Sequence, residues 1–373
     1  MRDPLRVLVV SSLSTDSGSY LRARQLANSL ERAGARVTLV NGIRSLPLML
    51  HYPLSLLLYL RVLFIQCDVL IGLKPLPNVG ILLLVKKLFG TLTVVDIDDV
   101  DFGFRSGPLS TVNRLLQLPV PKRCDLVTYH TDRLRSFIRE TFGVSDHKLF
   151  QLPQGVNATP PGADRTNSEA RRARFGTDAR LVVYTAHLNI ASDLDAILEI
   201  IRIAHARLPN LRFLVIGGGP LERRFQRIAR KLGVDRVTTF TGYVPPQEVA
   251  DYLLLGDAAV VYYKDIEVNY FRESMKLREM LGLGLKVVCN DVGDLKRFAD
   301  YTYQVDSDHQ SVARELVRVL ETGGDGRETR GKAYVDAHLD WNVFGERLFR
   351  RLLELQQVGA AERTTTSAAG GLG

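Results

Sequence analysis

The chain has 373 residues, more than a single hydrophobic core usually serves, so its length favours two domains. Charged residues make up 24% of the chain and hydrophobic residues 46%. This balance excludes wholesale disorder, a collagen-like fibre and a polytopic membrane protein. Lysine and arginine outnumber aspartate and glutamate by 49 to 41. Such an excess favours an anionic partner without choosing among nucleotide, lipid headgroup and nucleic acid.

The first part of the chain alternates between apolar runs and helical patterns. Residues 6–10 form a β-branched run typical of a strand that is buried on both faces. A polar loop follows at 14–19, then a helical pattern that Gly34 ends before the next strand at 37–40. This order is that of a βαβ unit. The pattern continues with strands expected at 69–71, 92–95 and 126–129 and a helix at 132–141.

A turn-rich passage at 160–164 separates this series from a second one. There the sequence predicts strands at 181–184, 212–216, 237–240, 258–262 and 286–289, and helices at 193–206, 221–232, 246–255 and 275–283. Two such series predict an α/β protein with two Rossmann-like parallel-sheet domains facing a cleft. We expect the domains at 1–158 and 159–342, a final helix at 343–357 that crosses back to the first domain, and a disordered tail at 358–373.

The cysteines and the N-terminal residues indicate in which cellular compartment the protein is expected. Cys67, Cys124 and Cys289 lie far apart and include no C-x-x-C spacing, so neither a disulfide framework nor a zinc site is expected. The first ten residues contain no apolar segment followed by a cleavage site, which predicts no secretion signal. A cytoplasmic location is therefore expected.

Two stretches of the second series contain candidate anion-binding residues. Gly217 and Gly218 follow a strand and precede a helix, so they indicate either close backbone approach to a phosphate or a tight turn. Farther on, Ser274 is placed to cap a helix whose first turn holds Lys276 and whose next turn holds Glu279. That start is either an anion site with a glutamate for sugar hydroxyls, or a charged surface helix with a simple cap.

The order of these motifs resembles that of retaining glycosyltransferases of family 4, which have the GT-B fold. The resemblance runs through nearly the whole chain to Leu355. It rests on the stretch at 267–291, the glycines with the basic helix after them, and two further segments at 152–157 and 340–342. It implies transfer of a sugar from a nucleotide-diphosphate donor, a UDP- or GDP-sugar, to an acceptor hydroxyl, with no other cofactor and no metal.

The resemblance assigns roles to individual positions. Glu279 matches a glutamate that binds the ribose of the nucleotide, and Gly18 matches a glycine that lets the backbone approach the diphosphate. The family's first glutamate falls on Phe271, which is a departure from the pattern. Either Glu267 or Glu273 replaces it, or the sequence belongs to a subgroup marked by the Ser-x-Lys-x-x-Glu spacing of Ser274, Lys276 and Glu279.

The family's arginine and lysine after the first strand of the second domain are also missing here. His187 stands at about the place of the arginine. The leaving diphosphate still needs positive charge, so Arg272 and Lys276 become the candidates. These departures leave an alternative, a catalytically impaired GT-B-like binding or scaffold protein.

Four carboxylates stand at the end of the strand near residue 95, namely Asp96, Asp98, Asp99 and Asp101. Hard cations favour carboxylate oxygens, but the resemblance implies no metal. It places Asp98 near the position at which the family often has a histidine close to the sugar. We therefore predict that Asp98 contacts the donor sugar or the acceptor. The other interpretation is a solvated acidic loop in which Asp96 caps a helix. His130, after the next strand, is interpreted as structural.

The segment at 54–65 is apolar and flanked by basic residues, but at about 12 residues it falls short of the roughly 20 that span a bilayer. It is either a helix packed on the sheet or a segment lying on an anionic membrane surface. We favour membrane contact, since the resemblance implies lipid-linked or glycan acceptors of cell-surface polysaccharide or glycoconjugate synthesis. Nucleic acid is not expected as a partner, because the basic residues are scattered.

Overall fold

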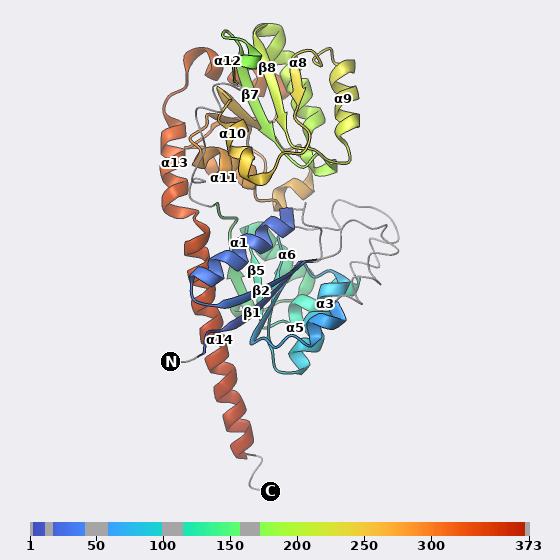
Figure 1. The fold of residues 1–373 in the computed structure, drawn as a ribbon, viewed down its shortest axis with the longest axis vertical. Coiled ribbons are helices and arrows are strands. Elements are labelled where there is room, and N and C mark those ends of the chain that lie inside the picture. The colour runs from blue at the N-terminus through green and yellow to red at the C-terminus, as the bar shows by residue number, and fades with distance from the viewer. Residues whose placement is uncertain (1–2, 12–17, 42–58, 99–114, 157–171, 370–373) are drawn as a thin grey trace. The chain divides into compact units, whose positions relative to one another are not determined.

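The computed structural model describes residues 3–11, 18–41, 59–98, 115–156 and 172–369 (Figure 1). The chain forms two compact units. Unit 1 comprises Met1–Gln154 and Trp341–Gly373, and unit 2 comprises Gly155–Asp340. Each unit contains a six-stranded sheet in which every strand pair is parallel. The predicted α/β class with two parallel sheets is confirmed.

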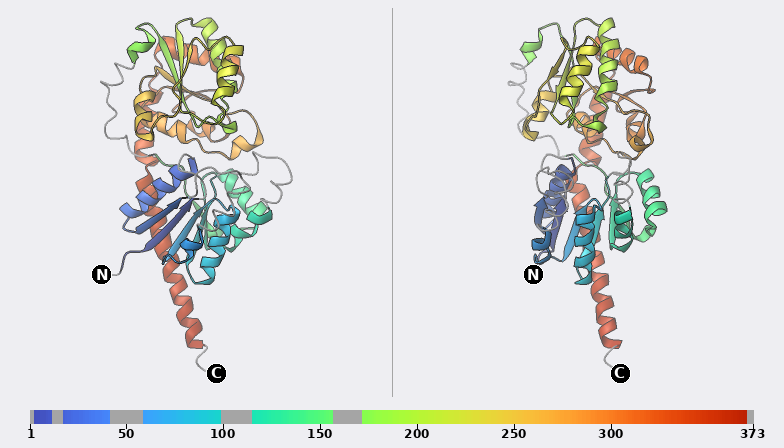
Figure 2. Two further views of the ribbon diagram at one scale, coloured as in Figure 1. Left: turned by 45° about the vertical axis from the view of Figure 1, so that its right-hand side comes forward. Right: turned by 90° about the vertical axis from the view of Figure 1, so that its right-hand side faces the viewer.

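Unit 1 has the strand order β2-β1-β3-β4-β5-β6. The strands are β1 (Arg6–Ser11), β2 (Arg36–Asn41), β3 (Val69–Leu73), β4 (Leu92–Asp96), β5 (Leu126–Tyr129) and β6 (Leu149–Gln151). The helices are α1 (Gly18–Arg32), α3 (Pro77–Leu88), α5 (Pro119–Arg123), α6 (Asp132–Phe142) and α14 (Trp341–Ala369). Strands β1 and β3 are buried because their residues are apolar on both faces, as a parallel sheet covered by helices requires (Figure 2).

Unit 2 has the strand order β12-β11-β10-β7-β8-β9. The strands are β7 (Arg180–Thr185), β8 (Leu211–Ile216), β9 (Thr238–Phe240), β10 (Ala258–Val261), β11 (Val287–Asn290) and β12 (Tyr303–Val305). The helices are α8 (Leu194–Arg207), α9 (Glu222–Lys231), α10 (Val249–Leu253), α11 (Met275–Gly282), α12 (His309–Thr322) and α13 (Arg327–His338), with short 3-10 turns that include η4 (Ile190–Ser192) and η6 (Glu267–Phe271).

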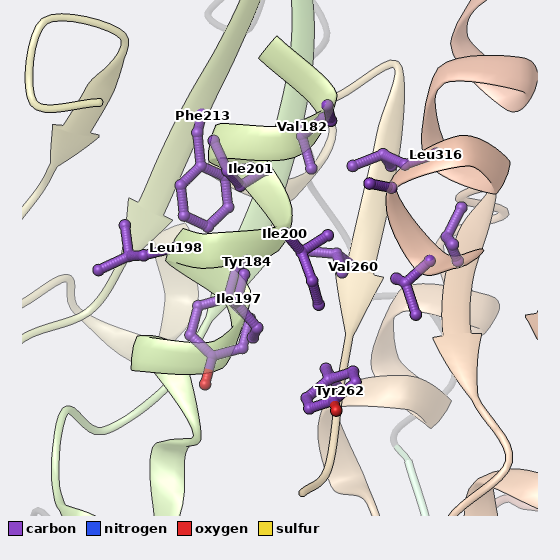
Figure 3. Packing of buried hydrophobic residues seen from close by; sticks show 14 of the residues in the cluster. Val182, Tyr184, Ile197, Leu198, Ile200, Ile201, Phe213, Val260, Tyr262 and Leu316 are labelled. Atoms are coloured by element: carbon purple, nitrogen blue, oxygen red, sulfur yellow. The ribbon is translucent and has the colours of Figure 1, made fainter. Parts of the chain in front are cut away.

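The core of unit 2 lies between this sheet and helices α8 and α12. Apolar residues recur along α8 at helical spacing, and eight of its side chains are buried. They meet strand side chains such as Val182, Phe213 and Val260 (Figure 3). The hydroxyl-bearing Tyr184 and Tyr262 also belong to this cluster. A rigid core therefore supports the strand ends from which the candidate site is built.

The C-terminal helix departs from the prediction in one respect. Helix α14 packs on α1 in unit 1, and Gly345 allows the contact, since a Cβ there would lie 2.5 Å from Cβ of Ser29. The sequence predicted a helix that ends at 357 and a disordered tail from 358. The helix instead continues to Ala369. The prediction of disorder over 358–369 is therefore wrong.

Candidate active site

The candidate site of unit 2 lies where the strand order of its sheet reverses. The chain runs outward from β7 to β8 and β9 on one side, and from β10 to β11 and β12 on the other. In open α/β sheets, ligands bind at such a switch point, outside the carboxyl ends of the strands. Tyr184 lies near the carboxyl end of β7, and Tyr263 follows β10. The predicted residues of helix α11 are brought to these strand ends.

Helix α11 is fixed at its start by Ser274 and by Arg278. Ser274 caps the helix, since its Oγ accepts a hydrogen bond from the Leu277 amide at 3.2 Å. The Arg278 guanidinium, which is 1% exposed, pairs with Glu273 and lies 2.8 Å from Asp294 Oδ2. The helix therefore packs into the unit, and the alternative of a charged surface helix is wrong. Glu273 is already committed to Arg278, which removes it as a replacement for the family's first glutamate.

Lys276 in the first turn of α11 reaches the end of β7. Its Nζ donates a hydrogen bond to the Tyr184 hydroxyl at 3.1 Å and lies 4.7 Å from the centre of that ring. The Tyr184 hydroxyl in turn donates to the carbonyl of Ser192. Burial and the neighbouring Arg272 lower the pKa of Lys276 to about 7, although Asp193 and Glu279 oppose the shift. The ammonium therefore lies in a site that lacks enough negative charge.

Arg272 is the second cation of the site. Its guanidinium lies 4.4 Å from the centre of the Tyr263 ring, and Nη1 donates to Asn269 Oδ1 at 2.9 Å. Its Nη1 also lies 3.8 Å from Asp193 Oδ2. The aromatic ring and Asn269 thus help to hold the guanidinium in place. A fixed guanidinium of this kind suits a phosphate or carboxylate ligand.

Asp193 organises the loop between β7 and α8. It has a left-handed backbone, with φ of 52°, which is uncommon for a residue other than glycine. Its Oδ2 accepts hydrogen bonds from Asn269 Nδ2 at 3.2 Å and from the Lys264 amide at 3.4 Å. Burial raises the pKa of this carboxyl, and Arg272 opposes the rise. Strained residues of this kind cluster at functional sites, where the surrounding structure holds them in place.

Glu279 lies one turn beyond Lys276, on the same face of α11. Burial raises its pKa to about 7, and the nearby Lys276 opposes the shift. A carboxyl in this state can accept hydrogen bonds from ligand hydroxyls when ionised and can donate one when protonated. Lys276 and Glu279, both with a pKa near 7, and Arg272 therefore mark the start of α11 as a candidate functional site.

The glycines after β8 have a packing explanation. A Cβ on Gly217, where φ is +115°, would lie 2.3 Å from the carbonyl oxygen of Ala186. A Cβ on Gly218 would lie 2.9 Å from the Tyr243 amide nitrogen, and the Gly217 amide already donates to Thr241 Oγ1 at 3.1 Å. Close approach of neighbouring loops therefore accounts for both residues. The tight-turn interpretation is the one that these contacts support.

The remaining predicted residues lie in different places. His187 is exposed in the loop after β7, where the Leu188 amide donates to the Gly218 carbonyl at 2.9 Å. Gly18 is the first residue of α1 in unit 1, and the loop before it lies outside the described residues. Asp98 also belongs to unit 1, and its carboxylate lies 3.4 Å from Lys74 Nζ. Glu267, the remaining candidate replacement for the family's first glutamate, is exposed at the start of η6.

Asp96 does not cap a helix, as one interpretation of the sequence had it. It is fully buried and makes a two-point ion pair with Arg22 of α1, at 2.7 and 2.9 Å, while accepting a hydrogen bond from Thr128 at 2.5 Å. Asp99 and Asp101 lie outside the described residues. Among the residues that the structure describes, no group of three His, Cys, Asp or Glu side chains is arranged to hold a metal ion.

Sequence reasoning missed Tyr184, Asp193, Tyr263 and Asn269. Tyr184 and Tyr263 stand at the ends of predicted strands and look like ordinary strand residues. Only their contacts give them a role: Tyr184 meets Lys276 across 92 residues of sequence, and Tyr263 meets Arg272. Asp193 had a weak signal as a polar residue before an apolar helical pattern, the usual position of a helix cap.

Comparisons with known proteins agree with this geometry. Residues 179–322 match the model of a family described as glycosyl transferases group 1. The chain is 29% identical over 134 residues to a GDP-mannose-dependent alpha-(1-6)-phosphatidylinositol monomannoside mannosyltransferase of Mycolicibacterium smegmatis, which covers 36% of this chain and 35% of the relative. It is 25% identical over 264 residues to a putative teichuronic acid biosynthesis glycosyltransferase, TuaH, of Bacillus subtilis, with 67% and 62% covered. The chain thus spans between about a third and three fifths of these relatives' lengths.

Solved structures share the fold over nearly the whole chain. Sucrose-phosphate synthase from Thermosynechococcus elongatus superposes with a TM-score of 0.75 at 14% identity, covering 98% of this chain and 100% of that one. The Anabaena protein HepE in complex with UDP and glucose superposes with a TM-score of 0.74 at 12% identity, covering 94% and 100%. These likenesses confirm the predicted GT-B fold.

Proposed function

Because residues 179–322 match the model of a glycosyl transferase family and the chain shares the GT-B fold, we propose that it transfers a sugar from a nucleotide-diphosphate sugar to an acceptor hydroxyl. The observation that carries this proposal is the pair of cations, Arg272 and Lys276, at the switch point of unit 2. Asp193 lies near Arg272, and both Asp193 and Glu279 favour the ammonium form of Lys276, but the pKa of Lys276 is still lowered to about 7. A diphosphate supplies the missing negative charge at this position.

In this proposal the donor lies along the start of α11. Arg272 and Lys276 bind the diphosphate and stabilise the charge that develops on it as the glycosidic bond breaks. Glu279 accepts hydrogen bonds from the ribose hydroxyls. The roles of Gly18 and His187 at the diphosphate and of Asp98 at the sugar or acceptor follow from the family resemblance. Fixing both substrates in place supplies much of the remaining rate enhancement.

The test is incubation with a panel of UDP- and GDP-sugars and measurement of free nucleotide, since glycosyltransferases without an acceptor commonly pass the sugar slowly to water. We expect at least one donor to be hydrolysed by the wild type. Lys276→Met and Glu279→Gln should slow this release by about tenfold or more. Lys332→Met removes a solvent-exposed lysine of the same unit, paired with Asp336, and should leave the rate unchanged. Donor binding without turnover would instead favour the impaired binding protein.

Retention of the anomeric configuration is a separate part of the proposal. It rests on the resemblance to family 4, with which the mannosyltransferase relatives are consistent. Proton NMR of the first product formed from an α-linked donor reports the configuration directly. An α-linked product supports retention, and a β-linked product contradicts it while leaving sugar transfer intact.

The relatives guide the choice of donor and acceptor to test. The mycobacterial relatives are named as GDP-mannose-dependent, whereas HepE was solved with UDP and with UDP-glucose. Among the named activities of the relatives are phosphatidylinositol mannoside and teichuronic acid synthesis. We therefore propose GDP-mannose and UDP-glucose as the first donors, and a lipid-linked or glycan acceptor of cell-surface polysaccharide or glycoconjugate synthesis.

Membrane contact would suit a lipid-linked acceptor, and unit 1 has an exposed apolar patch that supports it. We call Phe64, Leu88 and Phe89 the apolar patch. These three side chains are 85%, 85% and 80% exposed. Lys86 Nζ donates to the Ile65 carbonyl at 2.6 Å, which brings residue 64 beside the end of α3. Of the helical segment at 59–63, Tyr59 and Val62 pack inward. No helix within the described ranges is long and apolar enough to cross a bilayer.

We propose that the apolar patch contacts an anionic bilayer surface at the inner face of the cell membrane. Exposed Arg61 supplies nearby positive charge, whereas Lys86 and Lys87 are engaged with Ile65 and Asp125. Cosedimentation with vesicles of phosphatidylcholine, with and without phosphatidylglycerol, tests this. The double variant Phe64→Ser with Phe89→Ser should lose binding, and Val343→Ser, which changes an exposed apolar side chain on α14, should not. Equal sedimentation of all three proteins contradicts membrane contact.

A further inference from the structure

Three charged or titratable residues lie at the carboxyl edge of the other sheet, and the first of them borders its switch point. In unit 1 the order reverses between β1 and β3, which lie side by side. Lys74 comes directly after β3, Asp98 two residues after β4, and His130 directly after β5. These three strands are neighbours, so the residues share the carboxyl edge of the sheet, where α/β folds bind ligands.

Lys74 has an unusual backbone. Its φ is 64°, and among the described residues only Lys74 and Asp193 combine a positive φ with a side chain. Asp193 lies at the candidate site of unit 2, so both outliers mark a switch point. The Lys74 amide donates to the Asp96 carbonyl at 2.8 Å, which fixes this turn. A left-handed lysine costs free energy that glycine would avoid, which indicates a use for its side chain.

The side chain of Lys74 turns back to Asp98. Its Nζ lies 3.4 Å from Asp98 Oδ1, and only 8% and 10% of the two side chains are exposed. His130 Nε2 contacts the carbonyl oxygen of Asp98 and so holds that residue's backbone. Beneath them, the charge of Arg22 is met by Asp96. Lys74 is therefore the cation that directly faces the Asp98 carboxylate.

These surroundings decide the charge of Asp98. Burial acts to raise its pKa, but Lys74, Arg22 and His130 together lower the pKa below its ordinary value. Asp96, the acidic neighbour on the same strand, is neutralised by Arg22. The described groups around Asp98 thus favour its ionised form. The carboxylate also keeps a small exposed surface, since 10% of the side chain is exposed.

We propose that Lys74 is a positioning residue that holds Asp98 ionised and oriented at the edge of the unit 1 sheet, where Asp98 accepts a hydrogen bond from a hydroxyl of the sugar or acceptor. This rests on the proposed function. It goes beyond the predicted contact by Asp98, because it names the residue on which that contact depends. A carboxylate held in this way selects a neutral hydroxyl donor over an anionic substrate group, which it would repel.

The test compares Lys74→Met, Lys74→Arg and Asp98→Asn with the wild type in kcat/KM for transfer between pH 5 and 8. Lys74→Met should shift the acidic limb of the profile to higher pH, by about one pH unit or more, because Asp98 then protonates more easily. Lys74→Arg should restore the limb, and Asp98→Asn should lower kcat/KM by about tenfold or more at every pH. Lys87→Met, which breaks an ion pair with Asp125 in the same unit, is the matched control.

A second measurement needs no activity. A carboxyl whose folded-state pKa is lowered adds stability that is present above its unfolded pKa and is lost as the pH falls. The stability of the wild type relative to Asp98→Asn should therefore fall between pH 5 and 3. The same difference measured in the Lys74→Met background should fall less or reverse.

The outcomes separate this inference from the proposed function. If neither the wild type nor any variant uses a donor, the proposed function fails. The pH dependence of the stability difference between the wild type and Asp98→Asn still shows whether Lys74 pairs with Asp98. A role that is merely structural predicts that Lys74→Met lowers stability but changes neither the pH profile of kcat/KM nor the pH dependence of the stability lost in Asp98→Asn. That result would overturn the inference.

Discussion

Lys276 carries the central argument at the scale of single residues. Its ammonium has one hydrogen bond to the Tyr184 hydroxyl and lies near another cation, Arg272. A lysine placed only for stability would be expected near a carboxylate or in solvent. A half-buried cation that lies beside a second cation, and that Asp193 and Glu279 compensate only in part, is instead typical of a site that is completed by a ligand.

The first prediction concerns stability. Because the folded pKa of Lys276, about 7, is below its unfolded value of roughly 10.4, the unfolded chain binds this proton more tightly. Lys276 therefore destabilises the fold fully below pH 7, and the penalty fades as the pH rises toward 10. Lys276→Met should raise the Tm of unit 2 at pH 6 by roughly 2–4 °C, equivalent to about 1 kcal/mol. A fall in Tm, with Lys332→Met unchanged, would contradict the assignment.

The second prediction concerns the pH dependence of nucleotide binding. A bound diphosphate favours the ammonium form of Lys276, so binding takes up a proton above pH 7. The affinity advantage of the wild type over Lys276→Met for UDP or GDP should be largest near pH 6. It should shrink by up to about tenfold per unit above pH 7. The ratio is the quantity to compare, because titration of the nucleotide cancels in it; since Lys276 also lowers the pKa of Glu279, both proteins should contain Glu279→Gln. A ratio that does not change with pH would exclude Lys276 as a phosphate ligand.

At the scale of elements, helix α11 presents the site. Its start is defined by the Ser274 cap, and its buried face includes Leu277, Met280 and Leu281. Lys276 and Glu279 fall on the opposite, half-buried face. The position of one cap thus decides where both titratable groups lie.

The third prediction follows from that cap. Ser274→Ala should destabilise unit 2 by about 1 kcal/mol and weaken nucleotide binding, since the first turn frays and Lys276 loses its position. Ser274→Thr keeps the hydroxyl and should preserve most of both properties. Denaturant unfolding and nucleotide titration of the two variants measure this. If Ser274→Ala matched Ser274→Thr in both, the cap would not organise the site.

Elements differ in how far the sequence reveals them. The β-branched runs that become β1, β4 and β7 were predictable, because a strand buried on both faces needs continuous apolar residues. Strands β6 and β12 have three residues each, too few for a periodic signal. Helix α12 does show apolar residues at helical spacing, such as Val312, Leu316 and Val319, so it was predictable although it is missing from the helices expected for the second series.

Residues of the candidate site that are close in sequence were predictable, whereas contacts between residues far apart in sequence were not. Ser274, Lys276 and Glu279 are close in sequence, so helical spacing alone groups them. The Tyr184 contact comes from a strand 92 positions earlier. Asp96 was misread because its partner, Arg22, lies 74 positions away, and a carboxylate at a strand end resembles a helix cap until that partner is known.

At the scale of the whole molecule, Arg22 joins distant parts of unit 1. From α1 it pairs with Asp96 at the end of β4 and donates to the Leu152 carbonyl at 2.9 Å. It also lies 5.4 Å from the ring centre of Trp341, where α14 begins. A single buried guanidinium thus contacts the segment by which the chain leaves unit 1 and the one by which it returns.

The fourth prediction tests that network. Arg22→Met leaves the Asp96 carboxylate buried without its cation, and removing one partner of such a pair costs about 3–5 kcal/mol. The effect should appear as a lower Tm for unit 1. Arg6→Met removes a more exposed pairing with Asp68 in the same unit and should change stability much less. Equal effects of the two variants would contradict the role given to Arg22.

The account as a whole depends on nucleotide diphosphate binding at Arg272 and Lys276. Isothermal titration calorimetry of UDP and GDP against the wild type and Lys276→Met measures it most directly. We predict that one nucleotide binds the wild type, and binds Lys276→Met at least about tenfold more weakly at pH 6. Absence of binding by both nucleotides, or equal affinity in the two proteins, would contradict the proposed site.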